Sequence, residues 1–464
     1  MSMKNTNDVR LRRRHAAVIG LALAAPLAWA CAGSEEDHSA TGEPSERIDA
    51  GHVPSAGDDA AASGDASTND GDAGLKDARD GNAGQDADSA EDASDAQDPN
   101  RIVQIATGGT STTCAVTAAG AVYCWGDNGY GQLGVSSVTM EFSLTPKAVA
   151  GVADAVEVSV GSAHVCARRA SGSVVCWGDN SGGQHGDGTF GKGPGTNPEA
   201  TAVSGLTDAV EIAAGAEHTC ARRASGTVVC WGSNYLGALG DGTTVWASPT
   251  VVTVVGLDDA VQIAAGRFVT CARRAAGTVV CWGFNGNSQI GDGTTTDRPT
   301  PVAVLGLTDA VDVRTAPGWT FDGVYTVCAR RASGAAVCWG DNFYGQLGDG
   351  TTTASSTPVT VADLTNAVEV VPGLHTCARQ ASGAVLCWGR NDTGEIGDGT
   401  TTPRLAPVSV SGLTDAVEIS AGQYHTCARR ASGTIVCWGN NDYGQLGDGS
   451  MTQRLTPTAV TGLP

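Results

Sequence analysis

Short runs of alternating apolar and polar side chains fill the chain from residue 101 to residue 464. The segment 209–215 (AVEIAAG) alternates most clearly, and 218–222 and 227–231 are two further short apolar runs. Alternation with a period of two is typical of a β-strand that buries one face. We therefore predict strands over these three segments and a fourth over 249–255, whose proline places it at the edge of a sheet.

This succession of segments occurs seven times, at intervals of 49 to 57 residues between equivalent cysteines. Four short strands in a repeat of this length are typical of one blade of a β-propeller. We predict an all-β, seven-bladed β-propeller over residues 101–464, with a first strand from Ile102 and a last strand over 457–463. Terminal strands that meet in one place would close the ring and remove the exposed edge.

Fourteen of the 15 cysteines form seven pairs, each with nine intervening residues. In the third repeat, Cys220 and Cys230 are equidistant from Ser225, which lies in a predicted hairpin turn. They should face each other on neighbouring antiparallel strands, close enough for a disulfide. The short C-x-x-C clusters that a zinc site needs are not present, and buried reduced cysteines are the alternative. The predicted disulfides, one across each blade, join Cys114 to Cys124, Cys166 to Cys176, Cys220 to Cys230, Cys271 to Cys281, Cys328 to Cys338, Cys377 to Cys387 and Cys427 to Cys437.

The first 30 residues have the composition of an export signal. A basic segment precedes an apolar stretch over 16–28, which is too short to span a bilayer as a stable helix. The stretch leads into the sequence LAWAC, which is similar to the signal of bacterial lipoproteins, whose cysteine is lipidated after cleavage. Cys31 has no partner in the repeats, which favours lipidation; cleavage after residue 30 without lipidation is the alternative. We predict a signal peptide over 1–30 and a lipoprotein at the outer membrane or cell surface, or else a periplasmic or secreted protein.

Residues 31–100 contain 19 acidic and three basic residues and few large apolar side chains. Such a segment cannot bury enough surface to offset the entropy of ordering it, so we predict a disordered tether rich in Asp, Ala, Gly and Ser. Its Asp-Gly stretches lack the spacing of an EF-hand calcium loop. The repeat region is acidic as well, with 29 acidic and 20 basic residues, which argues against a nucleic-acid partner.

Each repeat carries glycines, a tryptophan and, in most cases, a histidine or threonine in a fixed order. The third repeat contains Gly215-x-x-His218-Thr219, Gly226-x-Val228, Trp231-Gly232-x-Asn234 and Gly240-Asp241-Gly242-Thr243. These motifs resemble those of the RCC1 (regulator of chromosome condensation) family of seven-bladed propellers. The resemblance implies one of several activities: nucleotide exchange on a nuclear GTPase, chromatin binding, light reception or inhibition of a secreted β-lactamase. The export signal argues against nucleotide exchange, and the acidic domain argues against chromatin.

Residues that occupy the same position in several blades lie far apart around a ring, so they are expected to serve the fold. This holds for four histidines and seven tryptophans, which we expect to bond or pack within and between blades: His164, His218, His375, His425, Trp125, Trp177, Trp231, Trp282, Trp339, Trp388 and Trp438. The sequence contains no nucleophile elbow or phosphate loop, and we expect no convergence of carboxylates near the central opening.

The repeats differ mainly in the loops that join their first to second and third to fourth strands, which should emerge on one face. Aromatic side chains on turns are typical of a binding surface, although some pack loop against loop. The candidate residues of this loop face are Trp319, Phe321, Tyr325, Phe268, Tyr424, Tyr130, Tyr235, Phe284, Phe343, Tyr344 and Tyr443.

These observations favour a non-enzymatic, monomeric binding or scaffold protein at the cell envelope. Its partner would be a protein or a glycan, with no cofactor and no metal. The alternatives are a lyase or hydrolase that acts on polysaccharide and a secreted enzyme inhibitor. An enzyme would need carboxylates that converge on the central opening.

Overall fold

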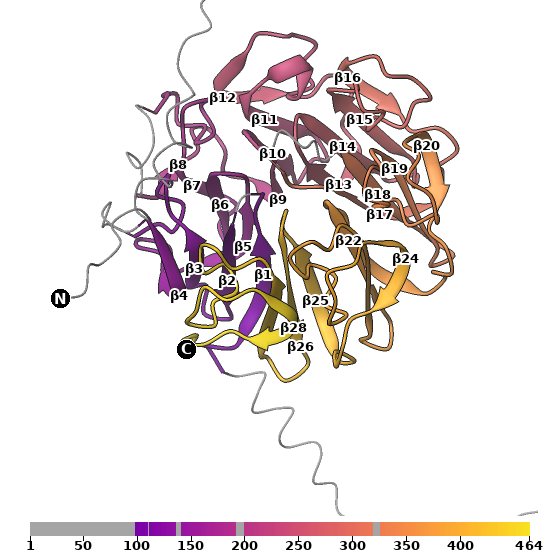
Figure 1. The fold of residues 1–464 in the computed structure, drawn as a ribbon. Helices are drawn as coiled ribbons and strands as arrows, with labels where there is room; N and C mark the ends of the chain where they lie inside the picture. Colours follow the sequence, from indigo (N-terminus) through magenta and orange to yellow (C-terminus); the bar gives the residue numbers. More distant parts are fainter. Residues whose placement is uncertain (1–97, 110, 136–140, 192–198, 319–324) are drawn as a thin grey trace, which may run out of the picture. The chain divides into compact units, whose positions relative to one another are not determined.

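Seven antiparallel sheets of four strands each surround a central axis in the computed structural model of the protein, among the residues that it describes (Figure 1). These residues are 98–109, 111–135, 141–191, 199–318 and 325–464. Within every sheet the four strands are hydrogen-bonded in chain order, and each blade is continuous in sequence. The prediction of an all-β, seven-bladed propeller is confirmed.

The strands fall into four sets by their place in the blade. The innermost strands, which line the axis, are β1 (Ile102–Thr107), β5 (Ala155–Val160), β9 (Ala209–Ala214), β13 (Ala260–Ala265), β17 (Ala310–Thr315), β21 (Ala367–Val371) and β25 (Ala416–Ala421). The second strands are β2 (Thr112–Thr117), β6 (His164–Arg169), β10 (His218–Arg223), β14 (Val269–Arg274), β18 (Thr326–Arg331), β22 (His375–Gln380) and β26 (His425–Arg430). The third strands are β3 (Val122–Asp127), β7 (Val174–Gly178), β11 (Val228–Ser233), β15 (Val279–Gly283), β19 (Ala336–Gly340), β23 (Val385–Gly389) and β27 (Ile435–Gly439). The outer strands are β4 (Phe142–Ala148), β8 (Thr201–Ala202), β12 (Ala247–Thr253), β16 (Arg298–Ala303), β20 (Ser355–Thr360), β24 (Arg404–Ser409) and β28 (Arg454–Ala459).

The hairpin between the second and third strands brings each cysteine pair together. In the third blade Cys220 lies directly opposite Cys230, and Gly226 supplies the positive φ of 89° that the turn requires. The Cα atoms of every bonded pair are 4.0 to 4.1 Å apart. All seven predicted disulfides are present.

The outer strands begin earlier than the sequence pattern predicts. The last strand covers Arg454–Ala459 instead of 457–463, and the third blade's outer strand covers Ala247–Thr253 instead of 249–255. The prolines were expected to start these strands, but Pro249 and Pro457 lie inside them. An outer strand has one unpaired edge, so a residue without an N–H is tolerated there.

The hydrophobic core lies between blades rather than within one. One cluster joins Val116 and Leu133 of the first blade to Val158 and Trp177 of the second, and equivalent clusters occupy the other seams. A blade that buries its faces only against its neighbours is stable only in the complete ring. The core of this protein is therefore a set of seven equivalent seams.

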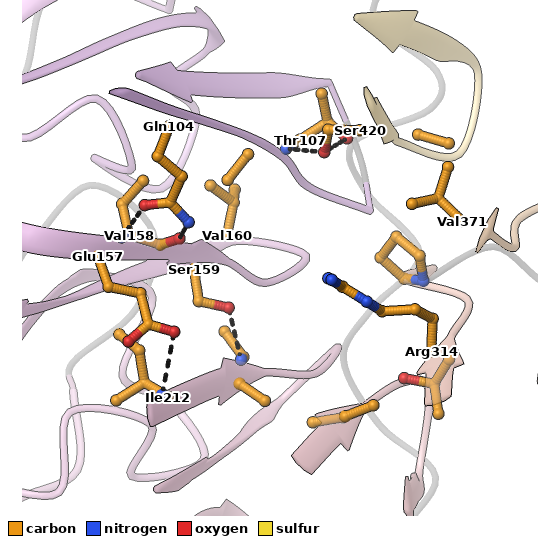
Figure 2. Close-up of a pocket in the computed structure, with 18 of the residues that line it drawn as sticks. Gln104, Thr107, Glu157, Val158, Ser159, Val160, Ile212, Arg314, Val371 and Ser420 are labelled. Carbon is orange, nitrogen blue, oxygen red and sulfur yellow. Dashed lines mark hydrogen bonds between the residues drawn. The ribbon is translucent and has the colours of Figure 1, made fainter. Parts of the chain in front are cut away.

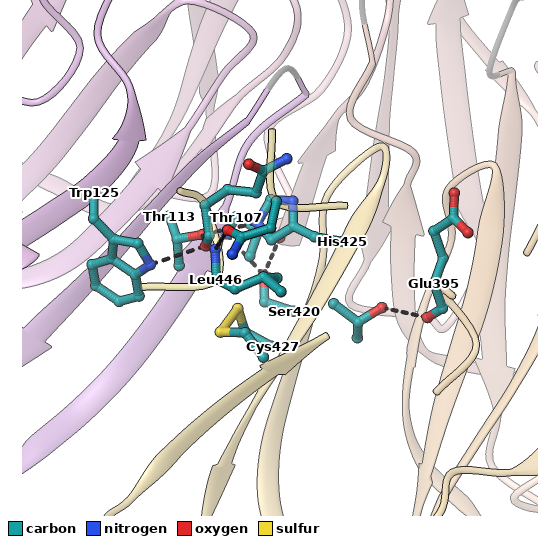
Figure 3. The surroundings of a disulfide bond; sticks show 12 residues. Thr107, Thr113, Trp125, Glu395, Ser420, His425, Cys427 and Leu446 are labelled. Carbon is teal, nitrogen blue, oxygen red and sulfur yellow. Dashed lines mark hydrogen bonds between the residues drawn. A yellow bond between two sulfur atoms is a disulfide. The ribbon is translucent and has the colours of Figure 1, made fainter. Parts of the chain in front are cut away.

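The ring closes by packing the last blade against the first, not by sharing a strand. Figure 3 shows this seam: His425 Nε2 lies 2.8 Å from Thr113 Oγ1, and the Ser420 hydroxyl oxygen accepts the Thr107 N–H at 2.9 Å. The first strand, β1, is the inner strand of the first blade and the last, β28, is the outer strand of the seventh. The two are not paired, so the expected removal of an exposed edge was wrong. Each blade keeps its own outer edge.

The short 3₁₀ helix η1 (Tyr235–Gly237) lies in the connection between β11 and β12 of the third blade. Across the described ranges, no helix has the length and apolar character to cross a bilayer. The predicted signal peptide, Cys31 and all but the last residues of the predicted tether lie outside the described residues.

Candidate functional site

A repeated hydrogen-bonded clasp joins each blade to the next. The indole N–H of every blade's tryptophan donates to a backbone carbonyl of the preceding blade at 2.7 to 3.0 Å. At the closing seam, Trp125 and the Thr113 hydroxyl both donate to the Gln445 carbonyl. All seven tryptophans have no exposed surface, which confirms the prediction that they pack blade against blade.

The four recurrent histidines belong to the same clasp. His164, His218, His375 and His425 place Nε2 2.7 to 2.9 Å from a threonine hydroxyl of the next blade. Where that threonine donates its own proton to a carbonyl, as Thr270 does to Ala238, the histidine Nε2 must carry the proton it shares. The predicted structural role of the histidines is confirmed.

Burial keeps these imidazoles neutral. The His218 ring is fully buried, and its Nδ1 has no hydrogen-bond partner among the described residues. Desolvation of the charged form lowers the pKa of His218 from 6.5 to about 4. The same cause lowers the pKa of His164, His375 and His425 to about 3; at His164 the neighbouring His185 and His218, and at His375 the neighbouring His425 and Arg390, add to the effect.

The loop face contains two clusters in which aromatic rings stack on an arginine. In the first, which we call cluster A, the Arg267 guanidinium lies 5.4 Å from the centre of the Phe268 ring and 5.3 Å from that of Tyr325. Tyr235 contacts Phe268 at 4.8 Å between ring centres, and Phe284 contacts Tyr325 at 5.1 Å. Cluster A therefore joins predicted binding residues from the third, fourth and fifth blades.

The second group, cluster B, is built around Arg390. Its guanidinium lies between Tyr424 and Tyr344, at 4.8 and 5.6 Å from the ring centres, and its Nε donates to Asp392 at 2.8 Å. Phe343 packs edge-on against Tyr344 with ring centres 4.9 Å apart. Stacking on two rings and pairing with a carboxylate hold this arginine in one orientation, which a flexible surface arginine lacks.

Three of the aromatic side chains predicted for the loop face are largely exposed. Phe343 exposes 72% of its surface, Tyr235 53% and Tyr443 48%. Phe268, Phe284, Tyr325, Tyr344, Tyr424 and Tyr130 are half-buried. Of these, Phe268 packs against the exposed Tyr235 ring and Tyr344 against the exposed Phe343 ring. The backbone of Phe268 adopts a left-handed φ of 56°, a strained conformation for an aromatic residue that points to a constraint at this loop.

Tyr130 and Tyr443 lie apart from both clusters, near acidic groups. Burial raises the pKa of Tyr130, and the Asp179 and Asp127 carboxylates raise it further. Trp319 and Phe321, the remaining predicted binding residues, lie outside the described residues. The structure therefore brings most of the predicted binding residues into two clusters and leaves Tyr130 and Tyr443 as a third, acidic sector.

One exposed aromatic pair and the stacked Arg390 are not among the residues predicted for the loop face. Phe190 and Trp246 stack with ring centres 5.4 Å apart and planes 20° apart, and expose 45% and 63% of their surfaces. Both lie in third-to-fourth-strand connections, the class of loop that the analysis had selected for aromatic residues. Arg267 and Arg390 are equally visible as departures from the repeat, since no other blade places arginine at these positions.

A cavity of about 340 Å³ occupies the propeller axis and is lined by all seven inner strands. Glu157, Glu211, Glu369 and Glu418 line it, and Figure 2 shows Arg314 reaching into it from β17. The expectation that carboxylates do not converge on the central opening was wrong. Inner strands lie so close to the axis that equivalent side chains from different blades face one cavity, which a count of residues along the chain does not reveal.

Each of these glutamates nevertheless accepts hydrogen bonds from an arginine and from a backbone N–H. Arg222 Nε donates to Glu211 at 2.8 Å, and the same carboxylate accepts the backbone N–H of Ile263 in the next blade at 3.2 Å. The same arrangement of an arginine on the second strand and a backbone N–H of the next blade holds Glu157, Glu369 and Glu418. These carboxylates tie blades together in the manner of the histidine clasp.

Burial has the largest effect on the pKa of three of these glutamates. Desolvation raises the pKa of Glu157, Glu369 and Glu418, while the paired arginines and the backbone N–H groups oppose the rise. The Asp312 carboxylate raises the pKa of Arg314, and Glu369 and Glu211 add to the effect against the cost of burial. Within the part of the chain that the structure describes, no group of three or more His, Cys, Asp or Glu side chains is arranged to hold a metal ion.

Sequence comparison matches the repeats to two models of one family. Both are described as the regulator of chromosome condensation (RCC1) repeat. One matches residues 102–132, 155–184, 209–238, 260–289 and 416–445, and the other 119–168, 225–273, 333–378, 382–429 and 432–464. The protein belongs to the RCC1 repeat family. The RCC1 motifs at Gly215, His218, Trp231 and Gly240 are, in the structure, the parts of the inter-blade clasp.

Curated relatives match this RCC1 protein over only part of their own length. The mitochondrial RCC1 domain-containing protein RUG3 of Arabidopsis thaliana is 31% identical over 281 residues, which cover 58% of this chain and 60% of RUG3. The ultraviolet-B receptor UVR8 of the same plant is 29% identical over 57% of this chain and 59% of UVR8. The chain therefore spans about three fifths of these relatives.

Solved structures of RCC1 propellers share the fold. Human WBSCR16 superposes with a TM-score of 0.64 at 21% identity, over 74% of this chain and 95% of that one. Prp20p of Saccharomyces cerevisiae gives 0.65 at 19% identity, over 75% and 87%. At these identities the likeness supports the propeller architecture alone.

Proposed function

We propose that this RCC1 propeller is a non-enzymatic binding protein that engages a protein partner through clusters A and B of its loop face. The observation that carries the proposal is the pair of arginine–aromatic stacks. Side chains from three blades form each stack, and each stack includes one largely exposed aromatic ring. Aromatic and arginine side chains are the residues that most often dominate binding energy at protein interfaces. Rings held by stacking lose little further conformational freedom when a partner binds.

The comparisons support a protein partner over other classes. A structure of Prp20p was reported with its binding properties to Gsp1p and histones, and another was solved bound to Kap60. The propeller of this chain has no basic surplus, so its partner is not expected to be a nucleic acid. A non-enzymatic role accords with the glutamates of the axis, which are engaged by arginines and backbone N–H groups and offer no free acid and base pair.

We further propose that the protein is exported and displayed at the cell envelope, anchored by a lipid on Cys31 and held away from the membrane by residues 31–100. The support is the signal-like sequence of residues 1–30 and the oxidised state that seven disulfides require, because disulfides persist outside the cytoplasm. The acidic, apolar-poor composition of the segment suits an extended tether.

The experiment that tests the binding face compares capture by the full chain and by a variant with Tyr235→Ala and Phe343→Ala, which removes the exposed ring of each cluster. These rings are exposed, so their loss should leave the thermal unfolding midpoint unchanged while at least tenfold less partner is captured from the native envelope or medium. Partners are identified by mass spectrometry, and binding to a glycan panel is measured in parallel.

A matched control removes an exposed apolar side chain outside the two clusters. Leu305 exposes 52% of its surface, and two other blades carry alanine at the equivalent position (Ala150 and Ala362), so Leu305→Ala should fold and capture as the parent does. Equal capture by the double variant and the parent would show that the face is assigned wrongly. Binding to glycans with no captured protein would replace the protein partner by a carbohydrate.

A further inference from the structure

The opposite face of the propeller, on the side of the hairpin turns between second and third strands, contains two recesses that differ in charge. Both lie where the inner and second strands of neighbouring blades meet. One recess, of about 500 Å³, is lined by Arg168, Arg222, Glu157, Glu211 and otherwise neutral residues of the first four blades. Its two arginines are ion-paired with its two glutamates, so it carries no net charge.

The second recess, which we call the cationic recess, lies on the fourth, fifth and sixth blades and has a volume of about 410 Å³. It contains four arginines and two carboxylates. The charged residues that line it are Arg273, Arg314, Arg330, Arg379, Asp312 and Glu369. The recess thus has a surplus of two positive charges, in a propeller that is acidic as a whole.

Two departures from the repeat produce this surplus, one at Gln262 and one at Arg314, and both act in the same direction. Gln262 in the fourth blade, like Gln104 in the first, stands where four other inner strands carry glutamate. Asp312 in the fifth blade is shorter than glutamate but keeps its charge. Arg314 stands where the other inner strands carry a small or apolar side chain: Ala106, Ser159, Ala213, Ala264, Val371 and Ser420. Repeats that otherwise keep their pattern have changed here at adjoining positions of one recess.

The contacts show which arginines of the recess have no carboxylate as an ion-pair partner among the described residues. Asp312 lies opposite Arg330 on the neighbouring strand, where other blades form an ion pair, but it is engaged by Gln262 and by Arg314 Nε, the latter at 3.3 Å. The buried Nε of Arg330 has no hydrogen-bond partner among the described residues. Arg273 Nε contacts only the neutral Oε1 of Gln262 within this recess, at 3.3 Å.

We propose that the cationic recess binds a small oxyanion, a carboxylate or phosphate group, between the guanidinium groups of Arg314, Arg330 and Arg273. Guanidinium groups present paired N–H donors that match these oxyanions, and a partly enclosed site strengthens the attraction. Arg314 exposes 47% of its side chain inside the axis, so a ligand can reach it. This site is independent of clusters A and B, which lie at the other end of the axis.

The test is calorimetric titration of inorganic phosphate, and separately of citrate, into the full chain at constant ionic strength set with chloride. We expect saturable binding, and we expect Arg314→Ala to weaken it about tenfold or more because one charge-assisted contact is lost. Alanine is the natural residue of three other inner strands at this position, so the variant should fold. Arg330→Gln, which keeps a donor but not the charge, should weaken binding to a similar degree.

Arg223→Gln serves as the matched control, since it removes the same charge outside the recess and the sixth blade carries Gln380 at this position. It should bind the anion as the parent does. Tighter binding of citrate would indicate a carboxylate ligand and tighter binding of phosphate a phosphate ligand, and either supports the site. No saturable heat with either anion, equal affinity in Arg314→Ala, or equal loss in Arg223→Gln would overturn it.

Discussion

At the scale of single residues, the seams between blades use two kinds of contact at equivalent positions, one polar and one apolar. Four histidines pair with a threonine of the neighbouring blade, as His218 does with Thr270. At the seam between the fourth and fifth blades, Val269 and Val327 stand at the equivalent two positions. The polar pair is neutral only while the imidazole is unprotonated. Since the folded pKa of His218 is about 4 and the ordinary value is 6.5, its contribution is complete above pH 6.5 and is lost as the pH falls through about 4.

We therefore predict that His218→Val combined with Thr270→Val makes the protein less sensitive to acid. Between pH 7 and pH 5 the free energy of unfolding should fall by about 2 kcal/mol less than in the parent, since one proton fewer is taken up on unfolding. Urea unfolding at several pH values measures this. The raised pKa values of Glu157, Glu369 and Glu418 act in the opposite sense, favouring the folded state as the pH falls, but they are common to both proteins and cancel in the comparison. An unchanged pH slope would contradict the assignment of a neutral buried imidazole.

At the scale of elements, the hairpin of the second and third strands is the unit that the disulfide closes. Replacing Cys220 and Cys230 together by alanine should lower the free energy of unfolding by about 3 kcal/mol, the chain-entropy value for a loop of this length. Denaturant unfolding measures the loss. Reduction of the denatured parent should add two hydrogens for each of seven disulfides by intact mass, and the variant should add two fewer. Free thiols in the unreduced parent, or equal stability of the variant, would show that the bond does not clasp the blade.

At the scale of the whole molecule, the propeller is a closed body whose two ends adjoin at one seam, and the proposed anchor precedes it in the chain. Cys31→Ala should move the full-length product from the detergent phase to the aqueous phase on partitioning, because the lipid would be lost while the propeller is untouched. Serine at position 31 should behave in the same way, and Cys220→Ala with Cys230→Ala should leave partitioning unchanged. A parent protein that remains in the aqueous phase would favour simple cleavage after residue 30.

Local sequence determined the blades, and the reason is geometric. Strand alternation, the turn at Gly226 and the symmetric placement of Cys220 and Cys230 act over distances of about ten residues, so a pattern along the chain suffices to predict them. Seven copies of a unit that cannot bury both faces alone imply a ring. The same pattern also correctly assigned the tryptophans and histidines to the fold, because repetition itself separates them from a single site.

Only the tertiary structure decided which of the residues that differ from the repeat pattern contact one another. Arg390 stacks between Tyr344 and Tyr424 from two other blades. Asp312 contacts Arg314 and Gln262 instead of Arg330, which lies opposite it. Such contacts depend on the radius of the ring and on the direction of each side chain, neither of which a one-dimensional pattern contains. For the same reason the sequence missed the carboxylates of the axis: residues about 50 positions apart become neighbours once seven inner strands surround one cavity.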